Sequence, residues 1–210
     1  DLTLASVVVL PNGFTLNGDL RTEPTGTLRM NGQTVQVNGD VVINGGGLEM
    51  TNAADQLTLS GNIEFNAGST VGKLIDGALR IGGDFLAGGS TQETFAPSAT
   101  HRTVFIGNGT QTINFQHPGP QSVRQHFQHL EVSQESDTDA IQFLNNAFVN
   151  GDVTIATGRV TGAAIVQLDG NLVDAAGGRW TAGTTTLTGS APSLPATSCI
   201  PHRPRSLRRA

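Results

Sequence analysis

The acidic and amide residues that could do chemistry in this chain form a regular series. Four copies of the pattern apolar-x-apolar-x-Gly-(Asp or Asn)-apolar lie between residues 14 and 85. Their acidic or amide positions are Asp19, Asp40, Asn62 and Asp84. If equivalent positions stack, these side chains lie about 5 Å apart, and calcium, which takes oxygen ligands, could bridge them. A calcium site needs roughly six to eight oxygens, however, and the Gly-Gly-x-Gly-x-Asp signature is absent. We therefore interpret the series as turn-forming residues and predict no metal site.

Three histidines are a second candidate for metal chemistry. His117, His126 and His129 lie close in the sequence, with Glu131 nearby, and imidazole is the commonest metal ligand. On a strand, however, His126 and His129 have opposite parity and point to opposite faces. We therefore expect solvent-exposed loop histidines rather than zinc ligands.

These residues belong to a repeat that runs through most of the chain. The glycines of the first four copies are 21, 22 and 22 residues apart, and two more copies follow. The six glycines are Gly18, Gly39, Gly61, Gly83, Gly151 and Gly170. A second pattern, Gly-x-Leu-x-Met, occurs at residues 26–30 and again at residues 46–50. Apolar and polar residues alternate within each copy, which indicates strands with one buried face.

The period of this repeat decides between two all-β architectures. Antiparallel sheets need a turn every 8–12 residues or so, but they do not require the same residue type from one strand to the third. A solenoid stacks equivalent positions directly and favours such identity. At about 3.3 Å per residue a 22-residue coil has a perimeter of about 70 Å, enough for three short strands around a filled interior. We predict an all-β, right-handed parallel β-solenoid, and we expect the corner Gly and Asx residues to adopt left-handed conformations.

Loops and a tail interrupt this pattern. We expect the solenoid to span residues 1–190 with loop insertions at 116–122 and 133–139, and loops on solenoids often carry function. Residues 191–210 are rich in Pro and Arg and should form an irregular tail, either native or produced by truncation or a frameshift. Because the sequence starts at Asp1 without a signal peptide, we also expect it to be a processed or excised piece.

The composition excludes several classes of protein. Charged residues make up 14% of the chain and 27 of its 210 residues are Gly, which argues against an ordinary helical or α/β enzyme. Four of the 12 basic residues lie in the last eight positions. The rest of the chain is acidic, and we expect no nucleic-acid partner. No apolar run approaches the ~18 residues of a membrane span, and the single cysteine, Cys199, excludes a disulfide framework.

Three stretches of the sequence resemble a known class of protein. Residues 50–62, 77–85 and 100–113 are similar to the repetitive β-solenoid regions of large bacterial surface proteins, which often carry Ig-like modules as well. The resemblance covers about residues 10–197 and implies an exported, multi-unit, non-enzymatic scaffold or adhesin. It implies no catalytic residues, because that family has no defined active-site motif.

Enzymes are also built on parallel β-helices, and they place acids and bases on one face of adjacent coils. The outward candidates in this chain are Arg21, Arg29, Glu49, Glu64, Lys73 and Arg80. Arg29 and Glu49 occupy matching positions in neighbouring coils, so we predict an ion pair between them. No compact set of two or three acids emerges.

We therefore expect a non-enzymatic structural or adhesive segment of an extracellular bacterial surface protein or fibre, located outside the cell or on its surface. Its expected partners are neighbouring repeats or copies of itself end to end, with surface polysaccharide as a further candidate. We expect no cofactor. The alternative is a carbohydrate-binding or carbohydrate-cleaving β-helix protein.

Overall fold

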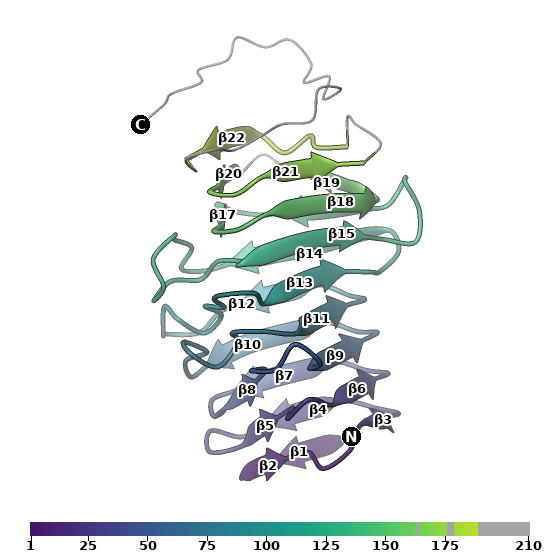
Figure 1. Ribbon diagram of the computed structural model, residues 1–210, viewed down its shortest axis with the longest axis vertical. Helices are drawn as coiled ribbons and strands as arrows, with labels where there is room; N and C mark the ends of the chain where they lie inside the picture. Colours follow the sequence, from purple (N-terminus) through teal and green to yellow (C-terminus); the bar gives the residue numbers. More distant parts are fainter. Residues whose placement is uncertain (163, 176–178, 189–210) are drawn as a thin grey trace.

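The computed structural model describes residues 1–162, 164–175 and 179–188, and all regular elements in these ranges are β-strands (Figure 1). With no helix in the described part, no helix there could cross a membrane. The expected tail at residues 191–210, including Cys199, lies outside the described residues.

The strands form three faces, which we number. Face 1 is an eight-stranded sheet of β1 (Leu2–Leu4), β4 (Leu20–Thr22), β7 (Val41–Asn44), β10 (Ile63–Ala67), β12 (Phe85–Ala87), β14 (Thr110–Phe115), β16 (Ala140–Phe143) and β19 (Arg159–Thr161). Face 2 is an eight-stranded sheet of β3 (Phe14–Leu16), β6 (Thr34–Val37), β9 (Gln56–Leu59), β11 (Ala78–Ile81), β13 (Arg102–Phe105), β15 (His129–Ser133), β18 (Val153–Thr157) and β21 (Leu172–Asp174). Face 3 has two three-stranded parts, β2 (Val7–Val9), β5 (Thr27–Arg29) and β8 (Gly47–Glu49), then β17 (Ala147–Val149), β20 (Ile165–Leu168) and β22 (Thr184–Leu187).

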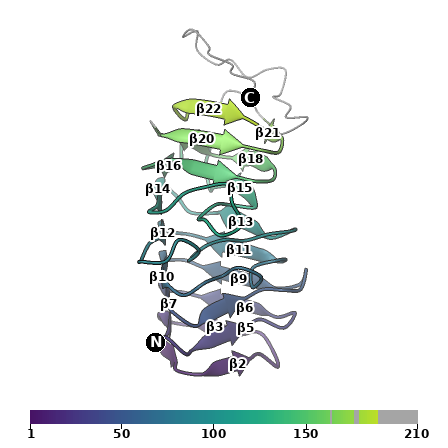
Figure 2. The same ribbon diagram turned by 90° about the vertical axis from the view of Figure 1, so that its left-hand side faces the viewer.

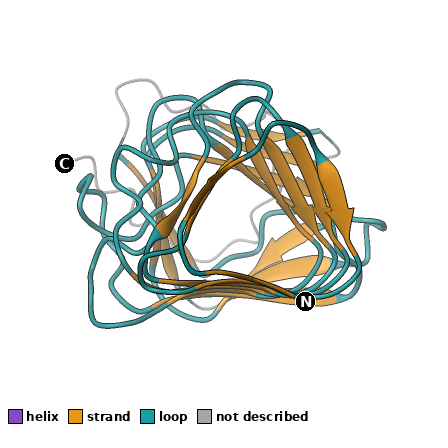
Figure 3. Ribbon diagram, turned by 90° about the horizontal axis from the view of Figure 1, so that it is seen from below, coloured by secondary structure: helices purple, strands orange, loops and turns teal. Residues whose placement is uncertain are grey.

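Neighbouring strands within each face are parallel and belong to successive coils. Leu20 pairs with Val41, and Val41 pairs with Ile63, 21 and 22 residues further on. In Figure 1 the nearer face 2 strands point to the right and the fainter face 1 strands behind them point to the left, while the chain rises from its N-terminus, so the winding is right-handed. Figure 2 shows the same stack from the side and Figure 3 shows its three-sided cross-section. The predicted parallel β-solenoid is confirmed.

The middle coils are longer because loops replace the strand on face 3. Phe85 pairs with Ile113 and Ile113 with Phe143, 28 and 30 residues apart. Segments 68–77, 88–101 and 116–128 run along this side. Isolated bridges join Leu74 to Met50, which follows β8, and Phe127 to Val149 of β17, and segment 88–101 lies between the other two segments through backbone hydrogen bonds of Ser98 to Leu74 and of His126 to Phe95.

A phenylalanine cluster fills the interior of these longer coils. Its fully buried members are Phe65, Phe85, Phe95, Phe105, Phe115, Phe127 and Phe143. Two of them, Phe95 and Phe127, come from the face 3 loops, and their ring centroids lie 4.8 and 5.3 Å from that of Phe85. Each buried aromatic ring contributes apolar contacts that strands would otherwise supply. The loops are therefore anchored in the core.

The repeated Gly-Asx pattern marks two different corners of the solenoid. The glycines of the first four copies, Gly61 among them, lie between a face 2 strand and a face 1 strand, whereas Gly151 and Gly170 lie between face 3 and face 2. The sequence pattern suggested one continuous column of six copies, but the copies lie at two different corners.

The reason for glycine at the first corner also differs from our expectation. Neither Gly61 nor the Asx residue beside it has a positive φ, so the left-handed conformation is not used there. A Cβ on Gly61 would instead lie 2.7 Å from the carbonyl oxygen of Gly39 in the preceding coil, and nearer still to Oδ1 of Asp40. Glycine is required because successive coils approach closely at this corner.

Candidate functional site

The Asx series forms a ladder of hydrogen bonds along the corner between faces 2 and 1. Oδ1 of Asp40 accepts the backbone N–H of Asn62 at 2.6 Å, and Oδ1 of Asn62 accepts the backbone N–H of Asp84 at 2.8 Å. Equivalent bonds continue the ladder back to Asp1 and forward to Thr112 at β14. The residues of this corner ladder are Asp1, Asp19, Asp40, Asn62, Asp84 and Thr112.

The corner ladder uses its side chains to join coils. Asp1, Asp19, Asp40, Asn62 and Asp84 each use Oδ1 to accept the backbone N–H of the next coil, and the bonds accepted by the Asp carboxylates are charge-assisted and therefore stronger than neutral ones. Among the described residues no group of three or more His, Cys, Asp or Glu side chains is arranged to hold a metal ion.

A second, shorter ladder follows the corner between faces 3 and 2. Nδ1 of His129 accepts the backbone N–H of Asp152 at 3.0 Å, and Oδ1 of Asp152 accepts that of Asn171 at 2.8 Å. His129 thus takes the place that an Asx residue has in the other coils. Its ring nitrogen is bonded to protein.

The expectation that the three histidines are exposed is wrong for His126. Its side chain is 1% exposed, and its ring nitrogens lie 2.8 Å from the carbonyl oxygen of Arg124 and 2.7 Å from that of Pro97. Burial lowers the pKa of His126, although the two carbonyl contacts oppose this shift. His126 is buried because segment 116–128 folds onto segment 88–101 while Phe127 enters the core.

His101 is a buried histidine that the sequence reasoning missed. It is completely buried, its Nδ1 lies 2.9 Å from the carbonyl oxygen of Asp76, and its Nε2 has no partner. Burial lowers the pKa of His101 to about 4, so the ring is neutral at pH 7. The available signal was parity, because His101 stands two residues before the inward Thr103, next to an apolar strand.

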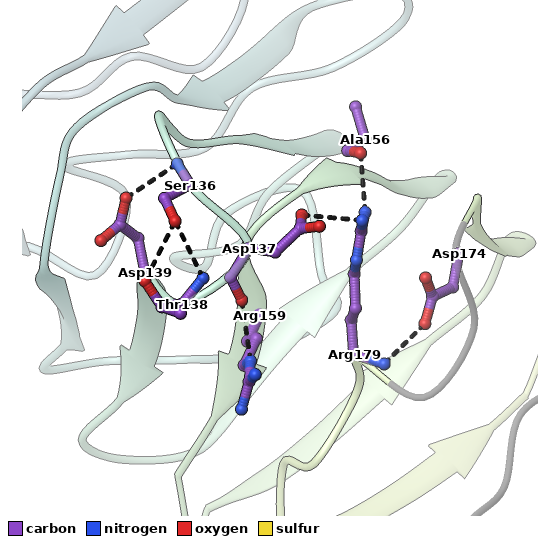
Figure 4. Close-up of polar contacts among 8 residues, drawn as sticks. All are labelled: Ser136, Asp137, Thr138, Asp139, Ala156, Arg159, Asp174 and Arg179. Atoms are coloured by element: carbon purple, nitrogen blue, oxygen red, sulfur yellow. Dashed lines mark hydrogen bonds and ion pairs between the residues drawn. The ribbon is translucent and has the colours of Figure 1, made fainter.

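The acidic loop at residues 134–139 is held by two arginines from later coils (Figure 4). Arg159 donates from Nε to the carbonyl oxygen of Asp137 at 2.8 Å, and Arg179 pairs with the Asp137 carboxylate at 2.7 Å. Arg179 also donates to the carbonyl oxygen of Ala156, and its backbone N–H donates to Asp174. This loop is therefore bonded to the two coils that follow it, through Arg159 and Arg179.

The outward face of face 1 carries an elongated hollow, which we call the face 1 groove. It consists of a first part of about 470 Å³ on the face 1 strands and an adjoining part of about 420 Å³ beyond the ends of β14 and β16, and the two parts share Leu144. Its first part is lined by corner residues and by the outward residues of β4 to β14. The outward residues are Arg21, Val42, Glu64, Leu86 and Asn114.

The charged residues proposed as enzyme candidates are spread over three faces. The predicted pair is confirmed, because Nε of Arg29 lies 2.6 Å from Oε2 of Glu49 in register on face 3. Arg21 and Glu64 line the face 1 groove, Lys73 donates to the carbonyl oxygen of Gly46, and Arg80 lies on face 2.

Comparison with known proteins adds nothing to this description of the fold and the contacts. No family model matches this chain, and no match was found among curated proteins or solved structures.

Proposed function

We propose that this chain is a non-enzymatic structural or adhesive segment of an extracellular bacterial surface protein or fibre. The observation that carries the proposal is the corner ladder, in which Asp40 and its equivalents bind the next coil's backbone. Asp and Asn side chains that bond one coil to the next suit a spacer that resists separation of its repeats. Repeat solenoids gain their stability from such nearest-neighbour interfaces.

The strands at the N-terminal end support association with neighbouring repeats or with copies of this chain. β1, β2 and β3 are the outermost strands of their sheets, and each has an edge that another strand could pair with. Val7 and Val9 of β2 are about half exposed, at 50% and 51%. We propose that neighbouring repeats, or copies of this chain end to end, cover this edge.

Sedimentation across a concentration series tests the end-to-end contact. We expect association that increases with concentration and weakens in a Val9→Lys variant, because a charge on an edge strand opposes pairing. A matched Thr58→Lys variant on face 2 should associate like the wild type. A wild-type protein that stays monomeric at high micromolar concentration would contradict this contact.

Surface labelling tests the proposed location. Antibodies raised against the purified chain should label intact cells of the source organism as strongly as permeabilised cells. Labelling that requires permeabilisation would contradict a cell-surface role.

The second candidate is a carbohydrate-binding or carbohydrate-cleaving β-helix, and the face 1 groove favours it. Arg21, Glu64 and Asn114 give the groove groups able to bond sugar hydroxyls. Mass spectrometry of polysaccharides incubated with the protein separates binding from cleavage. Shortened polysaccharides would establish an enzyme and overturn the non-enzymatic proposal. Intact polysaccharides that remain bound to the protein would support a non-enzymatic, carbohydrate-binding role.

A further inference from the structure

The face 1 groove follows the long axis of the solenoid. Arg21, Val42, Glu64, Leu86 and Asn114 are successive partners in the strand register, so they form one column of outward side chains. With strands about 4.8 Å apart, the groove extends about 24 Å from the coil of β4 to the coil of β16. A long, shallow hollow of this shape fits an extended polymer better than a compact small molecule.

Polar and apolar side chains alternate along this column. Polar Arg21, Glu64 and Asn114 are separated by apolar Val42 and Leu86. Leu144, which is 54% exposed, continues the apolar positions where the two parts of the groove meet. A sugar chain presents hydroxyl groups and apolar C–H faces in the same way, and binding sites combine apolar surface with a few placed polar groups.

Two of the polar side chains are fixed by neighbours and keep bonding capacity. Oε2 of Glu64 accepts from Nδ2 of Asn66 at 3.0 Å, which leaves Oε1 without a partner in the described structure. Oδ1 of Asn114 accepts from Nδ2 of Asn145 at 2.9 Å, which leaves Nδ2 of Asn114 as a donor. Side chains held in place before binding lose less entropy when a ligand arrives.

The charge of the groove selects against anionic polymers. Asp40, Glu64 and Asp84 line it together with one cation, Arg21, and acidic surfaces repel anions. We infer that the face 1 groove binds a neutral, extended oligosaccharide that runs parallel to the solenoid axis. This inference rests on the adhesive part of the proposed function and gives it a ligand class.

Titration calorimetry with the hexasaccharides of β-1,4-glucose, β-1,4-N-acetylglucosamine and β-1,4-mannose tests the inference. We expect at least one to bind, and we expect Glu64→Ala and Asn114→Ala each to weaken that binding about tenfold, the equivalent of one lost hydrogen bond. The matched controls Gln36→Ala and Thr58→Ala lie on the outward side of face 2 and should bind like the wild type. Circular dichroism should show the same melting curve for all four variants.

Three results would overturn the inference. These are no binding of any hexasaccharide at millimolar concentration, binding that the two groove variants leave unchanged, and a preference for a sulfated polyanion such as heparin. The surface-labelling result is independent of all three, so the proposed structural role can stand when this ligand assignment fails.

Discussion

The side chain of Asp40 crosses from one coil to the next and accepts the backbone N–H of Asn62 at 2.6 Å. Directly beside this contact, the backbone N–H of Gly61 donates to the carbonyl oxygen of Gly39 at 3.1 Å. The corner is thus bonded twice, once through backbone and once through a side chain. Backbone groups that lie outside the strands obtain partners in this way.

Asp40→Ala should lower the free energy of unfolding by about 1 kcal/mol, because the amide of Asn62 loses its acceptor. Asp40→Asn keeps an oxygen at the same position and should cost less. Urea denaturation measures both variants. Equal losses for Ala and Asn would show that the carboxylate charge, rather than the hydrogen bond, stabilises the corner.

Gly61→Ala should destabilise the protein by more than about 2 kcal/mol, since its Cβ would crowd backbone of the preceding coil. Gly88→Ala is the matched control. Its Cβ would meet only the flexible end of Gln116, at 3.3 Å, and Gly88 has no positive φ. If both variants have the same denaturation midpoint, crowding at the Gly61 corner is not the reason for glycine there.

Calcium should leave the melting temperature unchanged, as should a chelator, because the ladder side chains already bond backbone amides. A bound ion at 100 times its dissociation constant would add about 2.7 kcal/mol. A calcium-dependent rise of several degrees that disappears in Asp40→Ala would instead establish a metal site at the corner.

The coil period could be predicted from sequence because every coil faces the same packing problem. Leu59, Ile63 and Ile81 are all fully buried, as their parity indicated, and the match of residues 26–30 with 46–50 correctly paired Leu28 with Leu48. The pattern could not show that Gly151 lies at a different corner from Gly61, and the reason is physical. Close approach of coils occurs at more than one corner, so the same Gly-Asp pair fits either.

The burial of His126 could not be predicted, because it depends on a contact between two loops. His126 is covered only when segments 88–101 and 116–128 meet, and sequence periodicity contains no information about such a contact. The face 1 groove could not be predicted from the sequence either. Arg21 and Glu64 were recognised as outward-facing, but their alignment into one column with Val42, Leu86 and Asn114 required the observed strand register.

Acid should destabilise the protein through His101. The folded pKa is about 4 and the unfolded value is 6.5, so the unfolded chain binds the proton first as the pH falls. The contribution of His101, roughly 3 kcal/mol for a shift of this size, is complete above about pH 6.5 and is lost as the pH falls toward 4.

Denaturant titrations at pH 7 and pH 5 measure this effect. His101→Gln should reduce the loss of stability between these two pH values, and His117→Gln, a variant of a partly exposed histidine, should keep the wild-type loss. An unchanged loss in His101→Gln would assign the acid sensitivity to other groups, including His126, whose pKa is also lowered.

Pulling a single molecule by its two ends tests the proposed structural role most directly. A stack held by coil-to-coil bonds should resist extension and then release coils one at a time, each 22-residue coil adding about 70 Å of chain. Asp40→Ala should lower the force for release of the coils that it joins. Smooth extension at the low forces that stretch an unfolded chain, without steps, would contradict a solenoid that resists force along its axis.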